Sequence, residues 1–189
     1  MKMSSARFVP APQQAVWDAL NDPEVLKACV PGCESIERVS DTELTVQMTA
    51  KVGPVSAKFK GRITLSDVNP PTSYTLAFDG QGGVAGFGKG KAAVTLSSAI
   101  EGGTKGTQLA YDVDAQVGGK LAQIGSRLVD GAAAKMADDF FERFSARFGP
   151  APGTEAAGAD APAPAQPGAA VPAGLWGRFT AWLKRLFGA

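Results

Sequence analysis

Five stretches between residues 44 and 117 alternate strictly between apolar and polar side chains, the pattern of β-strands with one buried and one solvated face. Turn residues such as Gly53-Pro54 and Asn69-Pro70 separate the alternating stretches. Because only antiparallel sheets commonly leave one face wet, the pattern predicts an antiparallel meander. The five predicted strands cover 44–52, 57–65, 74–78, 92–96 and 109–117.

The spacing of apolar residues then changes to three or four, which is helical. The stripe predicts one helix of about 28 residues over 119–148, roughly 42 Å long, lying across the apolar face of the sheet. It consists of Leu121, Ile124, Leu128, Ala132, Met136, Phe140, Phe144 and Phe148.

Before the meander, a short strand is predicted over 4–9 and a helix over 12–20. Asp22 and Pro23 suit the cap and first turn of a second helix over 24–30, which ends at Pro31-Gly32. Residues 1–148 are therefore expected to form one α+β domain with a helix-grip layout, a curved antiparallel sheet closed over a long C-terminal helix.

The inner layer of this domain is the candidate binding region. The helix side chains that face the sheet near its start are small or medium, so a curved sheet leaves room for an apolar cavity there. A fully packed core is the alternative. The expected cavity residues are Met48, Phe59, Ile63, Tyr74, Leu76, Phe78, Tyr111, Leu121, Ile124, Leu128 and Met136.

Residues 80–92 contain six glycines. The stretch resembles a phosphate-binding loop but lacks the Ser or Thr that ligates Mg²⁺, and a strand rather than a helix follows. A mobile hairpin or an irregular strand with bulges is expected instead. Its tip would expose Phe87 beside Lys89, as a lid over the cavity, as a contact for a partner, or simply as a loose turn.

Composition changes at Gly149. Of the 25 residues over 149–173, 20 are Ala, Pro or Gly, and Val171 is the one large aliphatic residue. Such a segment buries too little apolar surface to offset its ordering entropy, so a disordered linker is expected.

Residues 174–189 form an amphipathic pattern of about 14 helical residues, too short to span a bilayer. Aromatic residues on one arc and basic residues opposite favour a helix that lies in a membrane interface, with a partner groove or the chain's own domain as alternatives. The apolar arc holds Leu175, Trp176, Phe179, Trp182, Leu183, Leu186 and Phe187, and the basic side chains are Arg178, Lys184 and Arg185.

Several functional classes are excluded. The chain has no histidine, which removes Ser-His-Asp or Cys-His catalysis and His-ligated metals. The net charge of +1 gives no uniform basic field for nucleic acid. Cys29 and Cys33 alone make a poor metal site and are expected to be reduced thiols, with a redox pair as the alternative. No catalytic constellation is found, and no metal site is expected.

Three blocks carry a resemblance to a known family: 31–34 (PGCE), 51–61 (KVGPVSAKFKG) and the region 106–127 with GTQL and DAQVGGKLAQIGSR. On these blocks, residues 1–148 resemble the G-subunit family of carbon monoxide dehydrogenase, in the START-like (polyketide cyclase, SRPBCC) superfamily. The resemblance implies a START-like fold and an accessory role beside a molybdenum-containing carbon monoxide dehydrogenase or related hydroxylase.

The resemblance also implies recruitment of that enzyme to membrane lipid and handling of a lipophilic quinone, menaquinone or ubiquinone, without a covalently bound cofactor. The first hypothesis is therefore a non-enzymatic quinone carrier. The second is a ligand-free membrane adaptor or assembly factor, and a small cyclase or hydrolase using Tyr74 or Tyr111 is a third. The first residues contain no secretory signal, so a cytoplasmic protein, peripheral on the inner face of the cell membrane, is expected.

Overall fold

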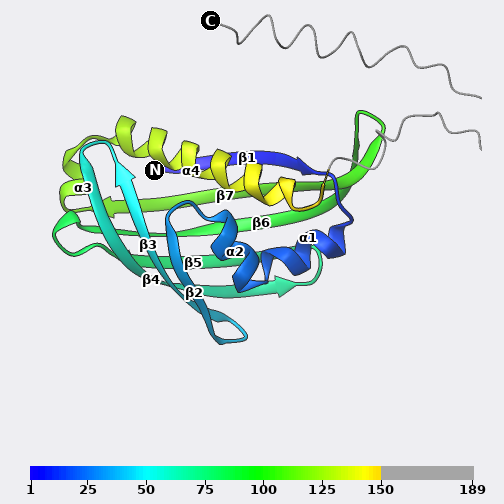
Figure 1. The fold of residues 1–189 in the computed structure, drawn as a ribbon, viewed down its shortest axis with the longest axis horizontal. Helices are drawn as coiled ribbons and strands as arrows, with labels where there is room; N and C mark the ends of the chain where they lie inside the picture. The colour runs from blue at the N-terminus through cyan, green and yellow to red at the C-terminus, as the bar shows by residue number, and fades with distance from the viewer. Residues whose placement is uncertain (150–189) are drawn as a thin grey trace, which may run out of the picture. The chain divides into compact units, whose positions relative to one another are not determined.

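Seven antiparallel strands form one sheet in the order β1-β7-β6-β5-β4-β3-β2, with helices against one face (Figure 1). The computed structural model describes residues 1–149. The predicted terminal helix, and the predicted linker apart from Gly149, lie outside the described residues.

The strands are β1 (Lys2–Val9), β2 (Cys33–Ser40), β3 (Glu43–Val52), β4 (Val55–Asn69), β5 (Ser73–Gln81), β6 (Phe87–Glu101) and β7 (Thr104–Gly118). The helices are α1 (Gln13–Leu20), α2 (Pro23–Cys29), the 3-10 turn η1 (Gly83–Ala85), α3 (Lys120–Gln123) and α4 (Ser126–Ala146).

The five predicted strands are confirmed as β3 to β7, each longer than its alternating stretch. The turn at Gly53-Pro54 is confirmed as a two-residue hairpin, because Val52 pairs directly with Val55. Gly53 has a φ of +56°, a conformation that favours glycine. This tight turn fixes the register, so the inward side chains of β3 and β4 face the same layer.

The predicted short strand and the two short helices are also confirmed. Pro23 occupies the first turn of α2, and the carboxylate of Asp22 accepts a hydrogen bond of 2.9 Å from the backbone N–H of Glu24. The cap satisfies one of the free donors at the start of the helix.

The strand β2 is missing from the prediction. Its sequence, CESIERVS, buries only Ile36, and its other side chains are half-buried or exposed. An edge strand carrying Glu and Arg shows no alternation, because solvent reaches both of its faces.

The prediction of one continuous helix over 119–148 is wrong. Gly125 has a φ of +93° and separates α3 from α4. After this break the helix is rotated relative to the predicted stripe, so Val129 is buried whereas Leu128 is 50% exposed. Leu128 therefore does not face the sheet as predicted.

The tightest packing lies beneath the C-terminal half of α4. Phe144 is fully buried, stacks on Phe140 with ring centroids 5.5 Å apart, and meets Phe148 edge-on. The same cluster includes side chains from both short helices and from several strands: Val9, Val16, Trp17, Leu20, Val25, Cys29, Tyr74, Val94, Leu96, Leu109 and Tyr111. This half of α4 closes the core and fixes the helix on the sheet.

Truncation of Phe144 tests this anchor. The Phe144→Ala variant of the full chain is expected to lose about 3–5 kcal/mol of unfolding free energy, because a fully buried aromatic ring leaves a cavity. Leu128→Ala, on the same helix but half-exposed, is expected to lose less than about 1 kcal/mol. Urea denaturation followed by circular dichroism measures both, and equal losses would contradict the assignment of the anchor.

Candidate functional site

An apolar pocket of about 370 Å³ lies between strands β2 to β6 and the α3–α4 region. That volume falls within the range of about 300–1,000 Å³ typical of small-molecule sites. Its hydrocarbon lining comes from Val30, Ile36, Val46, Met48, Ala50, Val52, Phe59, Ile63, Phe78, Leu121 and Met136, together with backbone at Gly61, Gly80 and Gly88.

Glycines open this pocket on its β5–β6 side. Gly80 pairs with Gly88, and Cβ atoms built there meet no atom closer than 3.6 Å and 4.0 Å, respectively. By contrast, a Cβ atom at Gly90 would lie 2.9 Å from Cζ of Phe78, and one at Gly82 would lie 2.7 Å from Cζ of Phe59. Gly80 and Gly88 therefore leave empty space in the pocket, whereas Gly90 and Gly82 make room for the aromatic rings that line the pocket.

The bulges expected in the glycine-rich stretch are absent. The β5–β6 register is continuous from Ser73–Thr95 to Gln81–Phe87 without a bulge. Phe87 and Lys89 follow the outer face of β6, since Gly88 and Gly90 face inward. Phe87 packs over Gly118 and is half-buried, so it is not an exposed lid residue, and Lys89 Nζ lies 5.7 Å from its ring centroid.

The structure brings six of the eleven expected cavity residues into the pocket: Met48, Phe59, Ile63, Phe78, Leu121 and Met136. Tyr74 and Leu76 instead line a separate cavity of about 120 Å³ near α1 and α2, and Tyr74 packs edge-on against Trp17 at 5.5 Å. Burial raises the pKa of the Tyr74 phenol.

The other three residues belong elsewhere. Tyr111 stacks on Phe141, with ring centroids 5.4 Å apart, in the packed half of the core. Ile124 lies at the break between α3 and α4, and Leu128 lies in a groove outside the pocket. The helix break is the common cause for the last two, because it displaces them from the predicted stripe.

Five lining residues were missed: Val30, Ile36, Val46, Ala50 and Val52. Three of them share the inward face of β3 with Met48, so the alternation itself could have identified them. Val30 ends α2 and Ile36 lies within β2, whose sequence shows no strand pattern, so no signal pointed to either residue.

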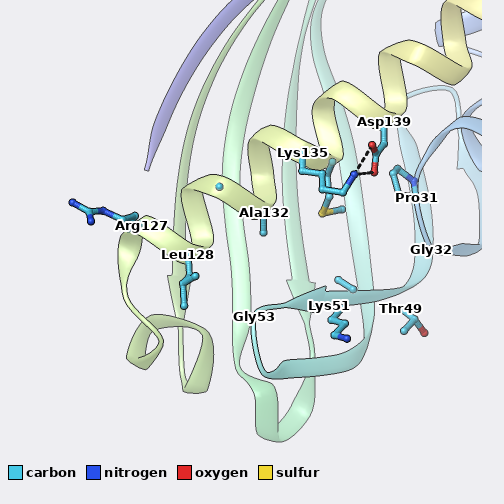
Figure 2. A pocket seen from close by; sticks show the side chains of 13 residues that line it. Pro31, Gly32, Thr49, Lys51, Gly53, Arg127, Leu128, Ala132, Lys135 and Asp139 are labelled. Atoms are coloured by element: carbon cyan, nitrogen blue, oxygen red, sulfur yellow. Dashed lines mark hydrogen bonds and ion pairs between the residues drawn. The ribbon is translucent and has the colours of Figure 1, made fainter.

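A polar groove of about 450 Å³ adjoins the pocket between the N-terminal half of α4 and the β3–β4 turn (Figure 2). Ala50 and Met136 line both spaces and mark the junction between them. Lys135 Nζ donates to Asp139 Oδ1 at 2.9 Å across one side of the groove, and Thr49 and Lys51 lie on the opposite side. The small residues Gly131 and Ala132 leave this part of the helix surface low.

One ionic cluster lies beside the groove. Thr49 Oγ1 donates to Glu34 Oε1 at 2.7 Å, and Lys58 Nζ donates to Glu34 Oε2 at 3.1 Å. These two hydrogen bonds, the one from Thr49 first, hold the pKa of the exposed Glu34 carboxyl below its usual value. The cluster ties β2 to β3 and β4.

Both cysteines are free thiols. Burial raises the pKa of Cys29 against the opposing effect of Arg147 and Arg143, and it raises the pKa of Cys33 against that of Lys27. Both thiols are therefore less reactive than an exposed cysteine at neutral pH.

Within residues 1–149 no group of three or more Cys, Asp or Glu side chains is placed to hold a metal ion. No helix in this same stretch is both long and apolar enough to cross a membrane.

Comparison with known proteins gives a consistent picture. The family described as the G subunit of carbon monoxide dehydrogenase (CoxG) matches residues 7–149. No curated protein matches the chain. A conserved protein from Geobacillus kaustophilus is 30% identical with a TM-score of 0.71, over 78% of this chain and 94% of that one.

Two more distant structures show the fold alone. A START superfamily protein from Mycobacterium smegmatis is 14% identical with a TM-score of 0.56, over 77% of this chain and 95% of its own. The Zhui aromatase/cyclase from Streptomyces sp. R1128 is 13% identical with a TM-score of 0.54, over 78% and 92%. The predicted START-like, helix-grip arrangement of the described residues is thereby confirmed.

Filling the pocket from Gly88 tests whether it takes up apolar molecules. In the Gly88→Leu variant the new side chain projects into the pocket, so fluorescence of a bound apolar dye such as Nile red is expected to fall at least fivefold. The control, Ala93→Leu, adds an equally large side chain on the exposed outer face of the same strand and is expected to leave dye binding unchanged. Equal dye binding by both variants would place the dye elsewhere.

Proposed function

This chain belongs to the CoxG family, the G subunit of carbon monoxide dehydrogenase, and from that premise we propose that it carries a lipophilic quinone. In this proposal it is a non-enzymatic accessory protein that recruits a molybdenum-containing carbon monoxide dehydrogenase, or a related hydroxylase, to the cytoplasmic membrane and delivers the quinone to it. The observation that supports the proposal is the apolar pocket of about 370 Å³ beneath the α3–α4 region.

The chemistry of the two adjoining spaces suits such a ligand. Met48, Phe59, Phe78 and Met136 offer aromatic and thioether surface to hydrocarbon. The groove offers the ammonium group of Lys135, the residue before Met136 on α4, as a hydrogen-bond donor to carbonyl oxygens. We assign the first isoprenoid units to the pocket and the quinone ring to its junction with the groove at Ala50 and Met136, where a partner enzyme reaches the ring.

The carrier role follows from what lines the pocket. The charged residues at its edge, Arg62 and Asp79, belong to the outer face of the sheet, since Gly61, Ile63, Phe78 and Gly80 occupy the inward positions. The inward side chains are hydrocarbon or thioether and supply no general base or nucleophile. Binding without turnover is the function that such a lining supports.

Quinone loading tests the proposal directly. The delipidated full chain is expected to bind menaquinone-4 or ubiquinone-2 in a 1:1 complex, detected by native mass spectrometry and by quenching of tryptophan fluorescence. Gly88→Leu is expected to weaken binding at least tenfold, and Ala93→Leu is expected to bind as the parent chain does. Failure of the parent chain to bind either quinone would overturn the carrier role and favour a ligand-free adaptor.

Membrane attachment is proposed to come from the basic amphipathic segment 174–189. Deletion of that segment is expected to reduce binding to anionic vesicles by at least tenfold, because it removes three basic and seven large apolar side chains. Trp182→Glu is expected to weaken binding more than Thr180→Ala, since Trp182 lies on the apolar arc. Vesicle sedimentation measures all three, and equal binding would refute the assignment.

A further inference from the structure

Three connections meet at one end of the sheet, the end where the pocket and the groove lie. They are the β3–β4 turn, the β5–β6 connection with η1, and the junction of β7 with α3. Their contacts are direct: a Cβ atom at Gly53 would lie 3.5 Å from Leu128 Cδ1, and one at Gly119 would lie 2.6 Å from Cα of Gly86. We call this part of the molecule the pocket end.

The pocket end is basic. Lys51, Lys89, Lys91, Lys120 and Arg127 are all exposed there. Each has no ion-pair partner among the described residues, whereas the neighbouring Lys58 is paired with Glu34. In Figure 2 the guanidinium of Arg127 points away from the groove into solvent. Carboxylates lie there too: Glu34, Asp114 and Asp139 are paired with lysines, whereas Asp79 and Asp130 have no ion pair among the described residues. The five unpaired cations outnumber these two carboxylates and leave a local positive charge.

The turns at the opposite end carry three carboxylates against one lysine, Lys105. Asp41 follows β2, Asp67 lies near the end of β4, and Glu101 ends β6 at the β6–β7 turn. All three carboxylates are exposed. Residues 1–148 carry 16 basic and 16 acidic side chains, so the positive field at the pocket end comes from separation of charge and not from an excess.

Two large apolar side chains are exposed among these cations. Val84, at the tip of η1, is 84% exposed, and Leu128, beside the β3–β4 turn, is 50% exposed. The turn η1 contacts α3, which leads directly into the helix that carries Leu128. Both apolar residues therefore lie at the pocket end, on different segments.

We propose that the pocket end is a docking surface for an anionic lipid bilayer, with Val84 and Leu128 inserting between headgroups that pair with the surrounding lysines and Arg127. The proposal rests on the quinone-carrier function and adds an orientation to it. With this end on the bilayer, the pocket opens toward the apolar phase from which the quinone comes, so the ligand does not cross water.

Lipid fits this surface better than an acidic protein does. The apolar residues stand singly on separate turns rather than forming the contiguous apolar centre of a protein interface. Exposed lysines and Arg127 around them match a fluid layer of anionic headgroups, for which each basic side chain contributes about a fivefold gain in affinity. An acidic protein is the alternative outcome of the test.

The test uses the full chain and reads which end meets lipid. In a Cys33→Ala background, Cys29 is buried, so a single new cysteine can carry the environment-sensitive fluorophore NBD. Separate proteins carry it at Leu128→Cys, at Val84→Cys and, as the control at the opposite end, at Glu101→Cys. Vesicles of phosphatidylcholine with phosphatidylglycerol are added, and vesicles of phosphatidylcholine alone serve as the neutral reference.

NBD at the first two positions is expected to brighten at least twofold and shift to the blue with anionic vesicles only, and NBD at the control position is expected to stay unchanged. Equal responses at all three positions, or none, would overturn the proposal, and none would favour an acidic protein as partner. Because the readout contains no quinone, it is independent of quinone loading, so failure of docking and failure of the carrier function are distinguishable.

A charge-matched pair of variants provides a second readout. Lys51→Gln and Lys105→Gln remove the same charge, from the pocket end and from the β6–β7 turn at the opposite end, respectively. Lys51→Gln is expected to weaken binding of the full chain to the anionic vesicles about fivefold. Lys105→Gln is expected to leave it within twofold, and equal weakening would show that only net charge matters.

Discussion

Large side chains fill the space between the sheet and the C-terminal half of α4, but not the space beside its N-terminal half. The candidate site depends on this difference. Phe140, Phe144 and Phe148 pack the C-terminal half of the helix into the core with α1 and α2. The N-terminal half presents Gly131 and Ala132 to the groove instead. Because the C-terminal half of α4 is fixed in the core, its N-terminal half is held at a set distance from the sheet. The small side chains there do not fill the space that remains. The groove follows from that difference in side-chain size along one helix, and the apolar pocket adjoins it at Ala50 and Met136.

Glycines on the inward face of the β5–β6 hairpin also leave space beneath the helix. At Gly90 and Gly82 the missing Cβ leaves room for the rings of Phe78 and Phe59, which lie against bare backbone. At Gly80 and Gly88 nothing takes the place of the missing side chain. Glycine ordinarily weakens a strand, and here the directly paired Gly80 of β5 and Gly88 of β6 leave open space beside the pocket. The expectation of bulges failed because composition alone does not reveal what the glycines face.

Much of the fold could be predicted because burial imposes a period on the sequence. Strands β3 to β7 each have one solvated face, and α1 and α2 have clear boundaries at Asp22 and Pro31. The same reasoning missed β2, whose two wet faces leave no period, and the break at Gly125, where a spacing of four continues across a glycine with positive φ. The break explains why Ile124 and Leu128 were placed in the cavity. Tyr74 and Tyr111 were misplaced for another reason: residues on one face of a sheet divide between core and pocket according to which helix covers them. Trp17 of α1 packs on Tyr74, and Phe141 of α4 packs on Tyr111.

The charge separation shows a further limit of reasoning from composition. In an antiparallel meander every second connection reaches the same end of the sheet. Residues near 51, 89 and 120 therefore come together, although some 70 positions separate the first from the last. Summed along the chain, these lysines cancel against Asp41, Asp67 and Glu101, and no basic region is visible. Once the strand order is known, the unpaired lysines and Arg127 lie on the segments that surround the pocket, and Asp41, Asp67 and Glu101 lie at the far end. Topology thus brings these cations and the segments that line the apolar pocket to the same end of the sheet, and an anionic surface attracts that end more strongly than the other.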